Sequence, residues 1–296
     1  MKGIGIAFLL FILVAPVLSA TLNPDPGLAQ PLSAALDTSQ LDLSQFAASI
    51  IKGERTDHER AVRLLDWLSH NFKWLATDYK QRTVKEIIDR RSGNCYELAV
   101  VYMALIKTLG IKYRQVAEIN IQPESEGRQK NAEAVVARCG FAGSVFGVQH
   151  NDHRWVEIYD EKSGEWIPAD PSVGVIGLEA WLKSRVWFGK RWAIETSITN
   201  EMIVPFAVFT TDSTRSMLED RTSYYLVTSL NRLYGGRLST LPSWGEWVRE
   251  LEAIGDKCRG AFDGRTNLHL YRAEIARLAS TYAKLRKEFE NRTEMR

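Results

Sequence analysis

Cys95 has the sequence context of a cysteine nucleophile. It follows the tight turn at residues 91–94 and opens a helical pattern, with Asn94 as the expected N-cap and Glu97 completing a capping box. The N–H groups of a first helical turn stabilise a thiolate, whereas an unassisted thiol with a pKa of about 8.5 is mostly protonated at neutral pH. A cysteine taken alone is more often a core residue, so the interpretation depends on its partners.

A histidine and an aspartate are predicted to meet across a β-hairpin. Side chains alternate along the strand that begins at His153, and Trp166, Pro168 and Asp170 would share one face of the next strand. With a turn of two or four residues, His153 lies opposite Asp170 or one diagonal step away, with Cβ atoms roughly 5 Å or 7–8 Å apart. Such a carboxylate fixes the tautomer of an imidazole and stabilises the imidazolium, but one bulge would break this geometry.

The elements that must position these residues are helices first and strands afterwards. Capping boxes at Thr56 and Thr83 predict two helices, and a third, mostly apolar helix should run from Cys95 to a C′ residue at Gly110. Strands are predicted at residues 111–121, 133–138, 153–159, 165–170 and 201–211, the last at a sheet edge because it contains Pro205. This order favours an α+β fold with an antiparallel sheet.

Beyond about residue 214 the chain is predicted to be helical. Two segments carry apolar seams of alternating three and four spacing, separated by a short loop with Gly260 and Gly264. The favoured interpretation is a helical hairpin whose seams face each other, and the alternative is a dimer interface. The seams are formed by Trp244, Trp247, Leu251, Ile254 and Cys258, and by Leu268, Tyr271, Ile275, Leu278, Tyr282, Leu285 and Phe289.

The N-terminal segment predicts export. Residues 1–20 read as a signal peptide, because an apolar run of about fifteen residues is shorter than the roughly 20 of a membrane span. The alternative is an uncleaved membrane anchor. We therefore expect a periplasmic or secreted protein, with residues 21–53 as a lead-in. In an oxidising compartment, if Cys95 must stay free, Cys139 and Cys258 are the pair left to form a disulfide, although Cys258 also suits the helical seam.

The charge pattern argues against nucleic acid as a partner. The formal charge is +2 over 296 residues, and no block of lysine and arginine stands out that would hold a phosphate backbone. Nucleic acid is therefore not an expected partner. A protein or peptide substrate is expected instead.

Three groups of motifs are specific as a set. They are Arg91-Ser92-Gly93-Asn94-Cys95 with residues 98–99, 104–105 and 109–111, then His153-Arg154-Trp155-Val156-Glu157 and Trp166-Ile167-Pro168-Ala169-Asp170-Pro171. In these motifs the chain resembles the transglutaminase-like superfamily, which is related to papain, in its exported, bacterial-type form. The likeness covers about residues 61–172.

The resemblance implies a fold and a chemistry. The fold would be a central Cys-bearing helix packed on an antiparallel sheet over residues 54–212, with a helical C-terminal extension at 213–296. Cys95 would be the nucleophile, His153 its base and Asp170 the orienting group, acting on an amide through a thioester without a cofactor. Hydrolysis is slightly favoured over transamidation. The alternative is a binding or assembly module that keeps the fold without turnover.

The sequence departs from the family pattern in two places. Tyr96 and Glu97 follow the nucleophile, whereas the family often has glycine directly after the cysteine or aspartate two residues after it. In addition, residues 122–150 form a long insertion before His153. Both departures lie where a substrate would dock, so substrate choice is left open.

Several other residues have a functional and a structural interpretation. His150 is a rival base but more typical of a loop, and one His pair without a second cluster does not predict a metal site. Trp74 and Tyr79 are candidate oxyanion donors, and Trp74 and Trp155 candidate substrate contacts. A sugar- or peptide-stacking surface is conceivable from three further tryptophans, for which core packing is the commoner explanation. These are Trp181, Trp187 and Trp192.

Overall fold

The computed structural model describes residues 42–75, 80–121, 151–186, 188, 204–212, 216–263, 265–266 and 268–294. Outside these ranges lie the predicted signal peptide, most of the lead-in, the predicted strand at 133–138, and several of the residues singled out above. Within the described ranges, no helix combines the length and the apolar character that a membrane crossing requires. The residues outside are Tyr79, Cys139, His150, Trp187, Trp192 and Gly264.

The described part of the N-terminal half contains four helices, and three of them begin where the capping patterns predict. The boxes at Thr56, Thr83 and Asn94 are all formed, each with a glutamate three residues later. The last of these helices is followed by Gly110, whose φ of +73° suits the C′ position. The helices are α2 (Leu43–Ile50), α3 (Asp57–Asn71), α4 (Val84–Arg90) and α5 (Cys95–Thr108).

A six-stranded sheet follows, with the order β6-β5-β4-β3-β7-β8 and antiparallel pairing throughout. A separate parallel pair joins β1 (Lys73–Trp74) to β2 (Ser92–Gly93) just before α5. The six strands are β3 (Tyr113–Ile121), β4 (Asn151–Asp160), β5 (Glu165–Asp170), β6 (Val175–Ile176), β7 (Val204–Thr211) and β8 (Met217–Asp220).

The prediction that the Pro205 strand lies at an edge is wrong. β7 pairs with β3 on one side and with β8 on the other, and β8 is the edge strand. Pro205 is accommodated because β8 pairs with β7 only from Phe209 onward, and because a register shift opposite Ile119 and Asn120 interrupts the β3–β7 pairing next to it. A missing N–H is tolerated at such a position.

The C-terminal part is helical after β8, whose presence corrects the prediction of helix from residue 214 onward. Gly260 is likewise not in a loop, because α9 continues to Phe262. The helices are α7 (Leu178–Arg185) before β7, then η3 (Tyr224–Ser229), α8 (Leu230–Leu233), η4 (Leu238–Thr240), α9 (Trp244–Phe262), η5 (Leu268–Tyr271) and α10 (Arg272–Glu294).

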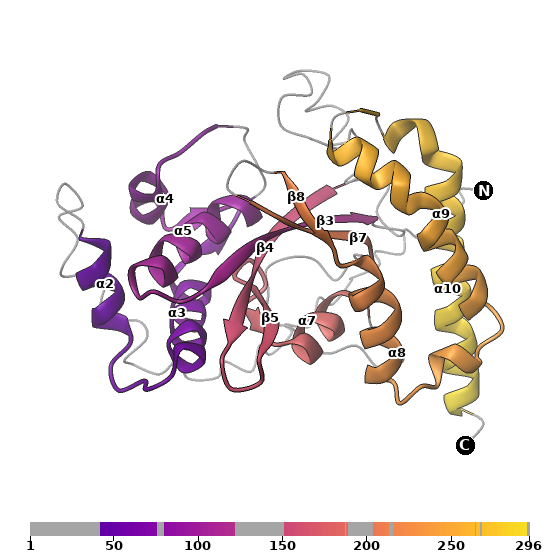
Figure 1. Cartoon of the computed structure of the whole chain (residues 1–296), viewed down its shortest axis with the longest axis horizontal. Helices are drawn as coiled ribbons and strands as arrows, with labels where there is room; N and C mark the ends of the chain where they lie inside the picture. Colours follow the sequence, from indigo (N-terminus) through magenta and orange to yellow (C-terminus); the bar gives the residue numbers. More distant parts are fainter. Residues whose placement is uncertain are drawn as a thin grey trace, which may run out of the picture.

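Helices lie on both sides of the sheet (Figure 1), and two apolar cores are formed. On one face, α2, α3, α4 and α5 pack against Val156 and Ile158 of β4. On the other, α7, α9 and α10 pack around Trp155 of the same strand. α9 and α10 pack side by side, most of their seam residues are buried, and the rings of Trp247 and Tyr282 lie 5.6 Å apart. The fold is therefore α+β, with the helix that begins at Cys95 packed on one face of an antiparallel sheet.

Candidate active site

Cys95 is the first residue of α5, and its side chain is partly exposed. Asn94 caps the helix by accepting the N–H of Glu97 at 3.1 Å, and the Glu97 carboxylate accepts the N–H of Asn94 at 3.0 Å. Cys95 thus sits among the N–H groups of the first helical turn, whose dipole favours an anion. This is the position that the sequence predicted for it.

The turn before Cys95 is held by close packing. An added Cβ on Gly93 would lie 2.8 Å from the Cβ of Glu97, so only glycine fits there. Glu97 is buried and also accepts a hydrogen bond from Arg82 at 2.8 Å. The glutamate that departs from the family pattern therefore anchors the helix start, whereas Tyr96 is 43% exposed beside the cysteine.

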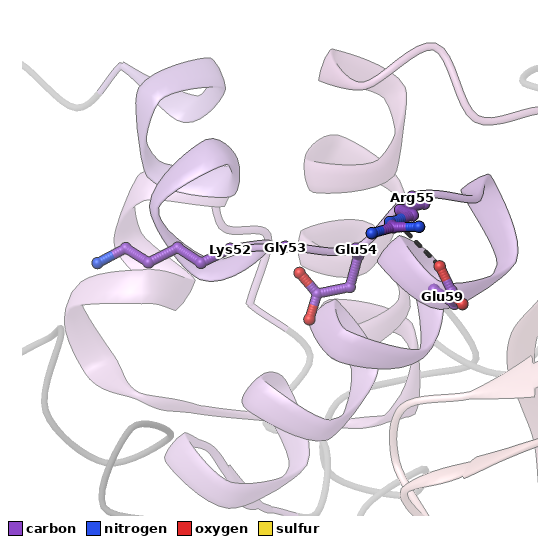
Figure 2. Close-up of a pocket in the computed structure, with 5 residues that line it drawn as sticks. All are labelled: Lys52, Gly53, Glu54, Arg55 and Glu59. Carbon is purple, nitrogen blue, oxygen red and sulfur yellow. Dashed lines mark hydrogen bonds between the residues drawn. The ribbon is translucent and has the colours of Figure 1, made fainter.

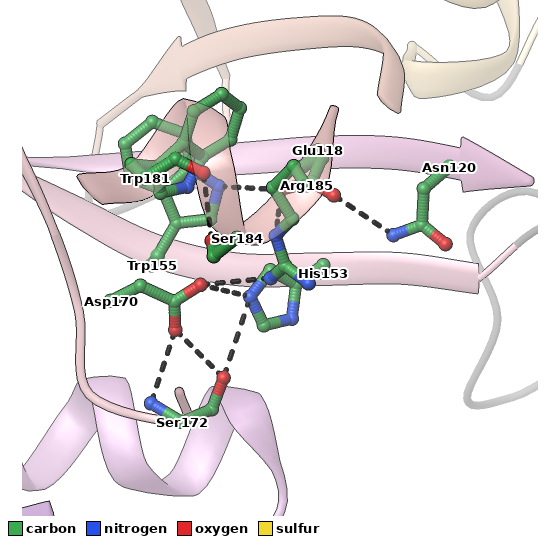
Figure 3. A network of polar contacts seen from close by, with 9 residues as sticks. All are labelled: Glu118, Asn120, His153, Trp155, Asp170, Ser172, Trp181, Ser184 and Arg185. Atoms are coloured by element: carbon green, nitrogen blue, oxygen red, sulfur yellow. Dashed lines mark hydrogen bonds and ion pairs between the residues drawn. The ribbon is translucent and has the colours of Figure 1, made fainter. Parts of the chain in front are cut away.

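His153 and Asp170 meet as the hairpin geometry predicted. β4 and β5 are joined by a four-residue turn, and their register places Asp170 one diagonal step from His153. His153 Nε2 and Asp170 Oδ2 are 2.7 Å apart, and both side chains are buried (Figure 3). This contact leaves Nδ1 as the ring nitrogen available to a thiol. Within the described parts of the chain, no hydrogen bond joins His153 directly to Cys95.

The Asp170 carboxylate is held by two further residues that the sequence analysis did not single out. Ser172 donates to Oδ1 through its hydroxyl at 2.7 Å and through its backbone N–H at 3.1 Å. Arg185, at the end of α7, donates from Nη2 to Oδ2 at 2.8 Å. The orientation of Asp170 is therefore set by its own turn and by a helix packed on the sheet.

A second buried acid completes the polar network. Glu118 of β3 stands directly opposite His153 in the strand register and has no exposed surface. It accepts hydrogen bonds from Trp155 Nε1 at 3.0 Å and from Asn120 Nδ2 at 3.1 Å, and its Oε2 lies 3.6 Å from Arg185 Nε. Figure 3 shows Arg185 between the two carboxylates.

These contacts shift the titration of the pair. Burial alone would lower the pKa of His153, but the charge and hydrogen bond of Asp170, together with a charged Cys95, raise this pKa to about 10. Burial would raise the pKa of Asp170, yet His153 and Arg185 hold it far below its usual range. A charged Cys95 also raises the pKa of His153 and of Arg185, so the sulfur lies within electrostatic range of both.

The remaining candidate residues are placed less favourably for contact with a substrate. Trp155 is 1% exposed, its N–H binds Glu118, and its ring packs on Trp181 and Tyr225, which argues against the predicted substrate contact. Trp181 is likewise fully buried in the core, as the commoner explanation held. Trp74 of β1 pairs with Gly93 of β2, and Gly93 is close in the chain to Cys95. The Trp74 side chain, however, packs partly against the core.

A shallow surface hollow lies elsewhere, where α2 joins α3 (Figure 2). Its chemistry is that of a helix cap, since the Glu59 carboxylate accepts the N–H groups of Arg55 at 2.9 Å and Thr56 at 3.0 Å. None of the residues of the predicted triad lines it. The hollow is bounded by Lys52, Gly53, Glu54, Arg55 and Glu59.

Comparison with known proteins gives the family of the domain. Residues 44–171 match the model of the transglutaminase-like superfamily. No curated protein matched the chain. Among solved structures, the chain is similar to a protein from Cytophaga hutchinsonii provisionally described as a cysteine protease, with 15% identity over 60% of this chain and 53% of that one, and a TM-score of 0.33.

It is also similar to a chain of Rad4–Rad23 bound to a 6-4 photoproduct UV lesion, with 13% identity over 77% of this chain and 53% of that one, and a TM-score of 0.31. The chain thus spans about half the length of each of these two proteins. The matched region of the family model contains α2 to β5, and with them the Cys95 turn and both strands of the His153–Asp170 hairpin. Residues 44–171 are a transglutaminase-like superfamily domain.

Proposed function

We propose that the protein is a cysteine enzyme that cleaves or exchanges amide bonds through a thioester on Cys95. The observation that carries this proposal is the buried 2.7 Å contact between His153 and Asp170, in a domain whose central helix opens with a partly exposed cysteine. In this proposal Cys95 is the nucleophile, His153 transfers protons and Asp170 orients the imidazole.

The raised pKa of His153 favours an imidazolium near neutral pH, as a thiolate–imidazolium pair requires. The thiolate attacks the amide carbonyl carbon, so that a C–S bond forms and the oxygen becomes negative. As the carbonyl re-forms, the C–N bond breaks and His153 gives its proton to the leaving amine. The backbone N–H of Cys95, at the helix N-terminus, is a candidate donor to the oxyanion.

The thioester is then resolved by a second nucleophile. When water attacks, His153 takes its proton, a C–O bond forms, the C–S bond breaks and the thiolate returns. When a primary amine attacks instead, the product is a new amide. We favour hydrolysis, because the described residues around Cys95 include no group that marks a dedicated amine site. The proposed substrate is a peptide bond or a glutamine side chain of a protein.

The test is alkylation of Cys95 by iodoacetamide at limiting concentration across pH. Cys139 and Cys258 are replaced by serine in all proteins, so that only one thiol reacts. We expect fast modification that persists below neutral pH, and we expect His153→Ala to abolish this low-pH reactivity. His150→Ala is the matched control and should change little. The adduct is counted by intact-mass analysis.

A reactivity midpoint near about 8.5, unmoved by His153→Ala, would identify an ordinary thiol. The enzyme proposal would then fall, and the domain would be a binding or assembly module. For a reactive Cys95, a glutamine-containing peptide with a labelled primary amine separates the two reactions. Incorporation of the amine indicates a transamidase, and release of the acid product in water indicates a hydrolase.

A further inference from the structure

Two cationic side chains share one oxygen in the buried network. Asp170 Oδ2 is 2.7 Å from His153 Nε2 and 2.8 Å from Arg185 Nη2. Arg185 is only 3% exposed, so its charge is not screened by water. A second cation is not needed to orient an imidazole, because the carboxylate alone suffices for that task.

Arg185 is itself held in place by the second acid. Its Nε lies 3.6 Å from Glu118 Oε2, and Glu118 is fixed by Trp155 and Asn120. The charged groups that face His153 therefore come from four elements. They are Asp170 of β5, Glu118 of β3, Arg185 of α7 and Cys95 of α5.

We propose that Arg185 is a positioning residue that keeps the His153 proton transferable. It does so by donating a hydrogen bond to the same Asp170 oxygen that His153 contacts, and Glu118 holds Arg185 in position. This inference rests on the proposed function, since a transferable proton matters only if His153 acts as acid and base. Without Arg185, two buried carboxylates would face a single imidazole, and that imidazole would release its proton less readily.

The effects of Asp170 and Arg185 on the pKa of His153 have the opposite signs that this role requires. Asp170 raises the pKa of His153, and Arg185 opposes it by lowering the same pKa. In the proposed hydrolysis, an imidazolium must first protonate the leaving amine, and the neutral ring must then deprotonate water. A histidine held too firmly in the charged form would perform the first step and fail in the second.

The experiment is an NMR titration of the His153 ring in full-length protein, with Cys95→Ala in every sample so that the thiol does not titrate. Removing the guanidinium in Arg185→Met should move the His153 midpoint to higher pH by about one unit or more. Glu118→Gln should move it to lower pH. Arg185→Lys, which keeps the charge, should restore most of the wild-type value.

The matched control is Arg221→Met. Arg221 also pairs with a buried glutamate on the His153 face of β4, its Nη2 lying 3.5 Å from Glu157 Oε1, but it makes no described contact with the His153 network. Its loss should leave the His153 midpoint unchanged. The double variant Arg185→Met/Glu118→Gln removes one charge of each sign and should titrate between the two single variants.

An unchanged midpoint in folded Arg185→Met would overturn the proposal, and so would equal shifts in Arg185→Met and Arg221→Met. Failure of every Arg185 and Glu118 variant to fold would show a purely structural role and overturn it as well. The titration needs no substrate. The absence of turnover would therefore refute the proposed enzyme, but the His153 midpoints could still be measured and compared.

Discussion

The ion pair between His153 and Asp170 should make the stability of the fold depend on pH on the alkaline side of neutrality. The pKa of His153 is raised from 6.5 to about 10, so the folded state binds the imidazolium proton more tightly than the unfolded chain does. Its contribution is fully present below pH 6.5, and it is lost as the pH rises toward 10.

The size of the effect follows from that difference. One pKa unit corresponds to about 1.4 kcal/mol, so the pair should contribute on the order of 3–5 kcal/mol at pH 6 that is absent at pH 10. Replacing the ring in His153→Gln removes the proton-binding site. We therefore expect the difference in stability between the wild type and the variant to narrow by that amount from pH 6 to pH 10.

The measurement is urea unfolding followed by tryptophan fluorescence at pH 6, 7, 8, 9 and 10, with the free energy extrapolated to water. The Cys95→Ala background gives a second comparison. A charged Cys95 also raises the pKa of His153. Without the thiolate, the loss should therefore be complete at a lower pH.

The reasoning would be refuted by a constant difference between the wild type and His153→Gln across this range. That result would mean that His153 has a similar pKa in the folded and unfolded states, and that its contact with Asp170 is a hydrogen bond of a neutral ring. A difference that widens toward pH 10 would contradict the sign of the shift itself.

Two further perturbations test the site and its frame. Asp170→Asn keeps the shape of the side chain but places an amide among the donors of His153, Arg185 and Ser172. We therefore expect kcat for a cleaved peptide to fall about 10³–10⁴-fold. We also expect the free energy of unfolding in urea to fall by about 3–5 kcal/mol. Gly93→Ala should destabilise the fold by about 1–3 kcal/mol, because the new Cβ would lie 2.8 Å from the Cβ of Glu97. Gly245→Ala is its control: it meets only the tip of Arg249 at 3.4 Å, so equal losses in both variants would contradict the packing argument.

Much of the local structure could be read from the sequence. The capping boxes at Thr56, Thr83 and Asn94 start helices where they were expected, because a cap is decided by residues three apart in the chain. The meeting of His153 and Asp170 was also predictable, since a hairpin with a short turn and no bulge transmits its register directly. The seams of α9 and α10 could also be predicted, because each is a periodic pattern of apolar residues along one helix.

The errors came from pairings that no local pattern encodes. β8 is a four-residue edge strand whose sequence has little β character, and its pairing with β7 moved the Pro205 strand into the sheet. Whether a strand lies at an edge depends on whether another segment pairs with it, and that segment can come from anywhere in the chain. Pro205 was a correct sign of a missing hydrogen bond but not of an edge.

The sequence by itself determined the nucleophile candidate, its helix, and the histidine and aspartate of one hairpin. Only the tertiary structure decided the rest of the polar network. Glu118 lies in the strand predicted at residues 111–121, but nothing in the local sequence linked it to Arg185 at the end of a helix. Their meeting requires β3 to pair with β4 and α7 to pack on the same face of the sheet. Burying these charges is favourable only where they compensate one another, and that balance exists only in the folded protein.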